Sequence, residues 1–375
     1  MATQNNQPTQ AQLTQQNADA RMMLLQSGMQ MVKQLQPQTG ALGSSIRIPL
    51  ERMGIMTGIM LDVTVPVDVT VAATASPFGP YNLFNSISYT DYAGIQRVLT
   101  SGAQLHLLNC FRTRNLQNNS QKMFGYIPAE TGIDTDILSL PTATGNALLQ
   151  FSVYVPCAVD PASDLRGAVL SQTIYGDHYI TVQLPPNLVA TDGLAAPYTA
   201  GTVALQAGQQ VSITAYQHYI MPQGGVSNLP MIDLSTIYAV EGNFNDSSNI
   251  VAGQPKYINY PNNRAILSAL HIFDNGNAGV HNGADLNRIV LMANSNTNVK
   301  EMSPRYLRRS MRALLSADVA SGVYYLESRV QPITTQLYGN VQTRFDIATV
   351  NAGAYFLSQY ESVYMSGTPL PGVIQ

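Results

Sequence analysis

The sequence predicts an all-β protein built from two sandwich-type domains. Segments in which apolar and polar residues alternate recur along the chain, and turn-forming residues separate them. Helical periodicity is evident in only two places. At 375 residues the chain is too long for one ordinary domain and is suited to two. Many short strands, frequent turns and few helices are typical of sandwiches and barrels.

The clearest strand lies between Leu61 and Val71. Every odd-numbered position there is Leu or Val, and every even-numbered one is Asp, Thr or Pro. Such alternation indicates an antiparallel strand with one buried and one solvated face. At about 3.3 Å per residue the segment is roughly 36 Å long, about twice the usual strand length. Pro66 lies on the polar side and lacks an N–H donor, so it indicates an edge strand or a bulge.

Shorter segments of the same kind follow along the chain. Turn signals such as Asp192-Gly193, Asn275-Gly276 and Asn282-Gly283 lie between them, because Gly and Asn tolerate the backbone angles of tight turns. The further expected strands include residues 149–155, 180–184, 211–215, 266–273, 323–326 and 355–357.

The N-terminal segment has a different composition. Residues 1–10 are rich in Gln, Asn and Thr and are expected to be disordered. From Ala11 to about Gln36 helix-forming residues dominate, until Pro37 ends the segment. Such a helix would dock on its own domain or on a neighbouring subunit, or would lie in the plane of a membrane, although one Lys and one Arg give little attraction to lipid. The apolar residues on one face of this predicted helix are Met22, Leu25, Met29 and Val32.

A second helix is predicted to begin at Ser303 and Pro304. Ser is a preferred N-cap, and Pro is favoured in the first helical turn. Apolar residues at helical spacing continue to Ser316 and define one face. The other face is basic, which is typical of a solvated surface or of pairing with acidic neighbours, and could alternatively hold a phosphate group. The basic residues are Arg305, Arg308, Arg309 and Arg312.

A glycine-containing segment at residues 223–225 separates two halves of similar length. We therefore expect an N-terminal arm and helix over residues 1–44. The first sandwich would cover residues 45–225, and the second sandwich with a C-terminal tail would cover residues 226–375.

The chain carries little charge. Charged residues make up 11% of the sequence, against about 25% in a typical protein, and the net charge is −3. A polar but largely neutral surface suits packing against further copies of the same chain. The first 40 residues contain only Arg21, Lys33 and Asp19 as charged residues. Because binding to naked nucleic acid depends on neutralising phosphates, no direct genome binding is expected.

No catalytic motif was found in the sequence, and no cofactor is expected. The five histidines are scattered, and Cys110 and Cys157 are too few for a disulfide framework. The weak metal candidates are Asp274 and Asp285, which occupy the first and twelfth places of a calcium-loop spacing. Gly and Ala fill the third and fifth places, where oxygen ligands are needed, so an Asn-Gly turn accounts for the same residues. No metal site is expected.

Several strings in the sequence resemble one family, the major capsid proteins of tectivirus-type bacteriophages, which have an internal membrane. The strings occur in the same order over most of the chain. The resemblance implies a fold and an assembly role, and it implies no catalytic residue. The clearest are Phe78-Gly79-Pro80, Pro230-Met231-Ile232-Asp233-Leu234-Ser235-Thr236-Ile237-Tyr238, Phe273-Asp274-Asn275-Gly276 and Tyr338-Gly339-Asn340-Val341.

The resemblance implies two eight-stranded jelly rolls per chain, an N-terminal helix near the membrane, and a short helix within the second barrel. It implies a homotrimer that tiles an icosahedral shell with neighbouring capsomers, penton proteins and minor capsid or membrane proteins above a lipid layer. The protein would be made in the host cytoplasm, since no signal peptide is expected, and would reside in the virion. The alternatives are a carbohydrate-binding sandwich of a receptor-binding spike, which needs an aromatic cleft, and a barrel hydrolase, which needs two close carboxylates.

Overall fold

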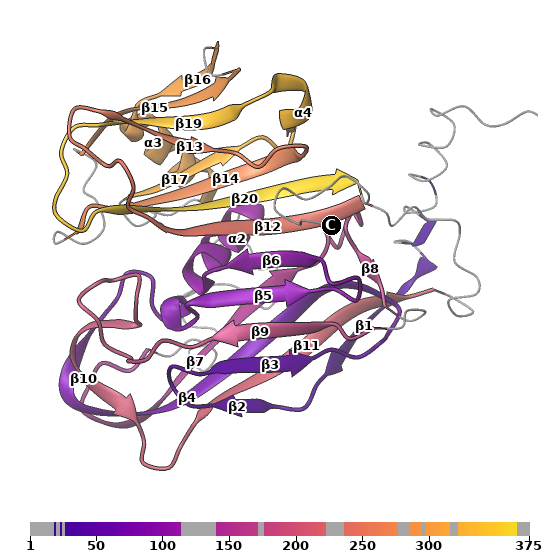
Figure 1. Ribbon diagram of the computed structural model, residues 1–375. Helices are drawn as coiled ribbons and strands as arrows, with labels where there is room; N and C mark the ends of the chain where they lie inside the picture. The colour runs from indigo at the N-terminus through magenta and orange to yellow at the C-terminus, as the bar shows by residue number, and fades with distance from the viewer. Residues whose placement is uncertain are drawn as a thin grey trace, which may run out of the picture.

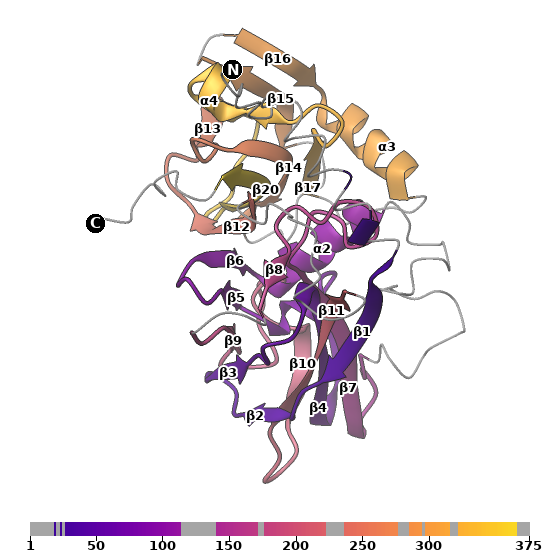
Figure 2. The ribbon, with the colours of Figure 1, turned by 90° about the vertical axis from the view of Figure 1, so that its right-hand side faces the viewer.

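The computed structural model consists of two β-barrels that lie side by side (Figure 1). Each barrel consists of two sheets that face one another, as the view along the barrels shows (Figure 2). The residues that the structure describes are 19, 23–24, 27–113, 140–171, 176–222, 236–276, 285–294, 297–315 and 322–365.

The first barrel pairs a four-stranded layer with the seven-stranded sheet. The four-stranded layer comprises β3 (Ser45–Pro49), β5 (Ser86–Thr90), β6 (Gln96–Thr100) and β9 (Tyr179–Gln183). The seven-stranded sheet comprises β1 (Met29–Gln34), β2 (Gln38–Gly40), β4 (Ile55–Ala75), β7 (Gly145–Pro156), β8 (Val169–Leu170), β10 (Tyr198–Leu205) and β11 (Val211–Met221).

The second barrel pairs two sheets of four main strands, with β18 (Ile333–Thr334) added beside β14. One sheet comprises β12 (Thr236–Asp246), β14 (Ala265–Asp274), β17 (Val323–Glu327) and β20 (Tyr355–Met365). The other comprises β13 (Pro255–Asn259), β15 (Leu286–Ala293), β16 (Thr297–Met302) and β19 (Val341–Ile347). In the first barrel β1 and β2 are likewise added beside β11, and β8 beside β4. Each barrel then has eight main strands, which confirms the predicted all-β, double jelly-roll fold.

A parallel strand pair joins the two barrels. Val98 and Leu99 of β6 pair with Val240 and Glu241 of β12, so the four-stranded layer of the first barrel continues into a sheet of the second. The apolar core also crosses this boundary. One cluster combines the interior of the first barrel with residues of β14, β17 and β20, and a second cluster fills the interior of the second barrel. The barrels therefore form one packed unit.

The predicted long strand is β4, which is 21 residues long. From Leu61 to Val69 the alternation of buried and partly buried residues follows the sequence pattern. Pro66 does not mark an edge, because β4 has partners on both sides. The partner on one side changes there from β11, which ends its pairing at Thr64, to β10, which begins at Val67. The missing N–H donor of Pro66 therefore falls at the change of partner.

Within residues 29–365, as far as the structure describes them, four short helical segments accompany the strands. The helix predicted from Ser303 and Pro304 is present as α3, where the backbone N–H of Tyr306 donates to the Ser303 hydroxyl at 3.1 Å. A helix that was not predicted, α2, lies between the two barrels (Figure 1). The segments are η1 (Tyr81–Leu83), α2 (Gly102–Thr113), α3 (Pro304–Leu315) and α4 (Thr335–Tyr338).

The helix predicted for residues 11–36 is wrong over its C-terminal part. Met23 and Leu24 are helical, but Met29–Gln34 form strand β1, which pairs antiparallel with β11 over six residues. The helix ends at Gly28, whose N–H donates to the carbonyl of Leu24. A Cβ at Gly28 would lie 2.4 Å from a side-chain carbon of Ile220. Pairing with the edge of β11 therefore replaces helical hydrogen bonds beyond this glycine.

Candidate functional site

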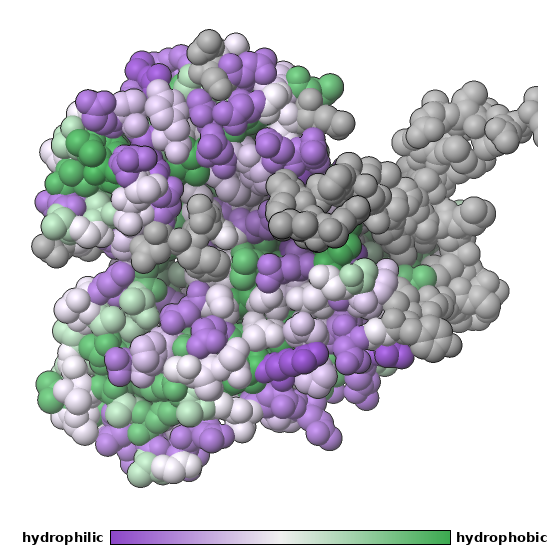
Figure 3. Space-filling view, in the orientation of Figure 1, coloured by the Kyte–Doolittle hydropathy of each residue, from purple (hydrophilic) through white to green (hydrophobic). Residues whose placement is uncertain are grey.

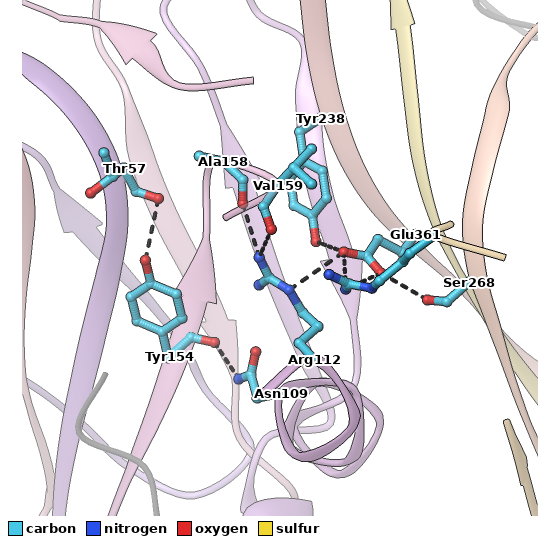
Figure 4. Close-up of polar contacts among 10 residues, drawn as sticks. Thr57, Asn109, Arg112, Tyr154, Ala158, Val159, Tyr238, Ser268 and Glu361 are labelled. Atoms are coloured by element: carbon cyan, nitrogen blue, oxygen red, sulfur yellow. Dashed lines mark hydrogen bonds and ion pairs between the residues drawn. The ribbon is translucent and has the colours of Figure 1, made fainter. Parts of the chain in front are cut away.

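A buried ionic cluster connects the two barrels (Figure 4). Glu361 of β20 is completely buried and receives hydrogen bonds from Tyr238 at 2.7 Å and from Ser268 at 2.8 Å. Arg329, which follows β17, donates to both carboxylate oxygens at 2.5 Å. Arg112 approaches from α2 of the first barrel, with its Nε 3.4 Å from the carboxylate. Arg112 is the member of the cluster that reaches across the boundary.

Contacts of helix α2 with both barrels hold Arg112 in place. The guanidinium donates to the carbonyls of Ala158 at 2.9 Å and Val159 at 2.5 Å. One turn earlier Asn109 donates to the carbonyl of Tyr154 at 2.7 Å. Phe111 stacks on Tyr325 of the second barrel with ring centroids 4.1 Å apart. Apolar stacking and charge pairing thus fix the helix between the barrels.

The electrostatics of this cluster favour an ionised Glu361. Burial acts to raise the pKa of the carboxyl, but Arg329, Arg112, Tyr238 and Ser268 outweigh it, and the pKa lies below its usual value. Two arginines and one carboxylate leave one excess positive charge, which the carbonyls of the first barrel help to stabilise. The arrangement is suited to holding two barrels together, since Glu361 binds residues of the second barrel and Arg112 of the first (Figure 4).

A second polar contact lies between the barrels near the end of β14. Tyr355 of β20 donates its hydroxyl to Asp192 of the first barrel at 2.8 Å. Asp274 at the end of β14 is 2% exposed and accepts a hydrogen bond from the N–H of Gly276 at 2.7 Å. Burial, together with the nearby charge of Asp192, raises the pKa of Asp274 to about 6, although the Gly276 hydrogen bond opposes this.

The two weak metal candidates do not meet in a cluster of ligands. Asp274 engages the N–H of Gly276, and Asp285 accepts a hydrogen bond from the Thr349 hydroxyl. Residues 277–284 between them lie outside the described residues. Within the part of the chain that the structure describes, no group of three or more His, Cys, Asp or Glu side chains could hold a metal ion. The Asp274 contact is the side-chain bond of a tight Asn-Gly turn.

The residues predicted to line an N-terminal helix have separate outcomes. Met22 and Leu25 lie outside the described residues. Met29 and Val32 lie in β1 with 63% and 57% of their surfaces exposed. Residues three apart in a strand point to opposite faces, so these two side chains do not share a face as a helix would have required. Their role in assembly or membrane contact remains a prediction.

The described histidines and cysteines have structural surroundings. His106 stacks on Tyr81 with centroids 3.6 Å apart, and burial lowers its pKa to about 3. His271 approaches the Ser358 hydroxyl at 2.9 Å, and burial also lowers its pKa to about 3. The thiol of Cys157 is buried, which raises its pKa to about 12. These groups are neutral at pH 7 and suit packing. Among the described residues, no helix is long and apolar enough to span a bilayer.

Two jelly rolls that share a sheet and are joined by a buried ionic cluster define a double jelly-roll protein. Family comparison agrees. Residues 2–222 match the sequence model for the P3 major capsid protein N-terminal domain, and residues 235–370 match the one for the C-terminal domain. The chain belongs to the P3 major capsid protein family, which confirms the resemblance seen in the sequence.

Individual relatives support both the family and the fold. The chain is 28% identical over 363 residues to the major capsid protein P3 of Enterobacteria phage PRD1, covering 92% of this chain and 90% of the relative. The crystal structure of the STIV MCP aligns with a TM-score of 0.65 at 15% identity, covering 90% of this chain and 97% of that one. The major capsid protein P2 of bacteriophage PM2 aligns with a TM-score of 0.52 at 10% identity, covering 89% and 97%. The last two show the fold.

Proposed function

We propose that this major capsid protein assembles as a homotrimer with a pseudo-hexagonal outline. The observation that carries the proposal is the fixed side-by-side placement of two similar barrels. Three such chains around a threefold axis place six barrels in a ring, which is the outline of a hexagonal tile. The shared β6–β12 sheet and the Glu361 cluster keep the barrels at one relative angle, as a regular tile requires.

The surface of the chain supports contact with further copies. In Figure 3 hydrophobic residues form patches on both barrels, with hydrophilic residues between them. Large apolar side chains are exposed at several places, including Val330 after β17 at 92%, Leu337 of α4 at 78% and Met29 of β1 at 63%. Contiguous apolar patches on a surface favour contact with other protein chains. The partners would be sister chains, neighbouring capsomers, and penton and minor capsid or membrane proteins.

The shell would enclose an internal lipid membrane, and the chain would perform no reaction. The first 40 residues carry too little positive charge to bind a genome directly, which fits a lipid layer between shell and nucleic acid. The polar groups of the Glu361 cluster bind one another, which is a structural use of buried charge (Figure 4). The protein would be made in the host cytoplasm and would reside in the virion.

The test is the mass of the purified chain in solution, measured by light scattering after size exclusion. A trimer is expected, with total buried interfaces well above about 2,000 Å² because obligate interfaces are large. A chain that stays monomeric at high concentration would contradict the proposal. A glycan array provides a separate control, since measurable sugar affinity would favour the receptor-binding alternative.

An N-terminal deletion tests the role of the arm. Removing residues 1–27 leaves β1 intact, so the shortened chain should fold and form trimers. We expect these trimers to assemble few closed shells when particles are counted by negative-stain microscopy. Normal shell yield would show that the arm has no part in assembly.

A further inference from the structure

Helix α3 presents a cluster of positive charge on the surface of the second barrel. Its buried face consists of Pro304, Leu307, Met311 and Leu315, which anchor it against β15 and β17. The opposite face carries four exposed arginines within two turns. We call this surface the arginine face; it comprises Arg305, Arg308, Arg309 and Arg312.

Three of the four arginines on this face are not paired within the described part of the chain. Arg305, Arg308 and Arg309 form no ion pair with a described residue, whereas the other arginines of the second barrel, such as Arg288 and Arg344, pair with carboxylates. The positive charge of this face is opposite in sign to the net charge of the rest of the protein. Without these four arginines the formal charge of −3 would become −7. A second copy of the chain is therefore an acidic partner for this helix.

A matching acidic surface exists on the first barrel. The outer face of the seven-stranded sheet carries Asp62 and Asp68 on β4, both partly exposed. No Lys or Arg occurs in β4, β7, β10 or β11. The cross-strand neighbours of these aspartates are uncharged: Asp62 pairs with Ser152 and Thr214, and Asp68 with Asn146. The strands β4, β7, β10 and β11 thus offer a polar surface whose full charges are negative, while Lys33 of the neighbouring β1 pairs with Glu51 at 3.8 Å.

The two surfaces lie on the same side of the molecule. In Figure 2 both α3 and the strands β4 and β7 are on the right, whereas β3, β5 and β9 are on the left. Two copies related by a twofold axis parallel to the strands would face each other with these sides. The first barrel of one copy would then lie opposite the second barrel of the other. Each arginine face then meets the acidic sheet of the other copy, and the interface closes on itself.

We propose that the arginine face of α3 docks on the outer face of the seven-stranded sheet of a second copy, as a contact between neighbouring capsomers. The contact rests on the proposed shell function and names the surfaces through which capsomers meet. Charge pairs across such a contact set the relative orientation of the two copies and their association rate. The attraction weakens as the salt concentration rises.

The test reverses the charge of the helix in Arg308→Glu with Arg309→Glu. Sedimentation velocity separates the trimer from associated trimers, so both levels of assembly are measured at once. We expect intact trimers whose mutual association at low salt is weaker by at least about tenfold. The matched control is Arg47→Glu on β3, an exposed arginine on the opposite side of the molecule that stacks on Tyr179. It should leave trimer association unchanged.

A charge swap identifies the partner surface. Adding Asp62→Arg and Asp68→Arg to the reversed helix should restore association, because the attraction is rebuilt with opposite signs. Association that is unchanged by the helix reversal, or not restored by the swap, would overturn the contact while leaving the trimer proposal intact. Loss of the trimer itself in the unaltered chain would instead overturn the proposed function.

Discussion

The helices α2 and α3 are alike in construction and opposite in use. Each has 12 residues, follows directly after an antiparallel strand pair, and begins behind a serine that caps its first turn. Yet Arg112 of α2 points into the boundary between barrels and pairs with Glu361, whereas the arginines of α3 point to solvent. The difference follows from burial, because α2 lies between the two barrels whereas α3 packs against the second barrel. The same element thus serves as an internal joint in one barrel and as an outward surface in the other.

The largest effect should come from breaking the joint. In Glu361→Ala the buried Arg112 and Arg329 lose their counter-ion, so the free energy of unfolding should fall by about 3–5 kcal/mol in urea denaturation. The control Glu301→Ala removes an exposed carboxylate that pairs with Arg288, and should cost less than about 1 kcal/mol. Equal losses in the two variants would show that the cluster does not hold the barrels together.

The two buried carboxyls between the barrels should respond to pH in opposite directions. Glu361 has a lowered pKa, so its contribution is present above the unfolded value near 4.5 and is lost as the pH falls through its folded pKa. Asp274 has a pKa raised to about 6, so the folded chain binds a proton that the unfolded chain has released. Stability therefore falls as the pH rises from about 4 to about 6.

Asp274→Asn should remove this second dependence. The Asn side chain keeps an oxygen that accepts from the N–H of Gly276 but carries no charge. The variant should be more stable than the natural chain by up to about 2 kcal/mol at pH 7.5, with little difference at pH 4. Urea unfolding at both pH values checks this, and a gain that is equal at both would contradict the raised pKa.

Substitutions at the two helix caps should have smaller effects on the free energy of unfolding, and the two can be compared directly. In α2 the N–H of Gln104 donates to the Ser101 hydroxyl at 3.2 Å, and in α3 the N–H of Tyr306 donates to that of Ser303 at 3.1 Å. Ser101→Ala and Ser303→Ala should each cost about 1 kcal/mol. We expect the larger loss for Ser101, because its hydroxyl also donates to the Gln104 side chain. A larger loss for Ser303 would reverse the comparison.

The smallest effect on stability is expected at the surface helix. Arg309→Ala should change the free energy of unfolding by less than about 0.5 kcal/mol, since the side chain is exposed and pairs with no described residue. Thermal and urea unfolding measure the change. A loss above about 1 kcal/mol would mean that the arginine is bound within its own chain, and would contradict its assignment to an outward contact.

The elements that could be predicted from the sequence are those with one buried and one exposed face. From Leu61 to Val69 strand β4 has one buried and one partly exposed face, and α3 has one buried stripe, so both could be predicted from periodicity. Helix α2 was missed because it is buried almost all round, which erases the helical period. The remaining signal was the pair Ser101 and Gln104, whose spacing is that of a capping box.

The joint between the barrels could not be predicted from the sequence. Glu361 is a single charged residue within a strand, and its partner Arg112 lies at a distance in sequence that no local pattern spans. The N-terminal segment shows the opposite problem. Residues Met29–Gln34 have a helix-like composition, but the open edge of β11 supplies strand partners that the sequence does not reveal.

The β6–β12 pairing has a mechanical consequence. Backbone hydrogen bonds across this pair resist sliding of one barrel against the other, and the stacked Phe111 and Tyr325 rings behind it resist hinging. Each chain then acts as a stiff plate. When a shell of such plates swells under pressure from its contents, the strain is taken up at the joints between chains, so the lattice yields there before any barrel deforms.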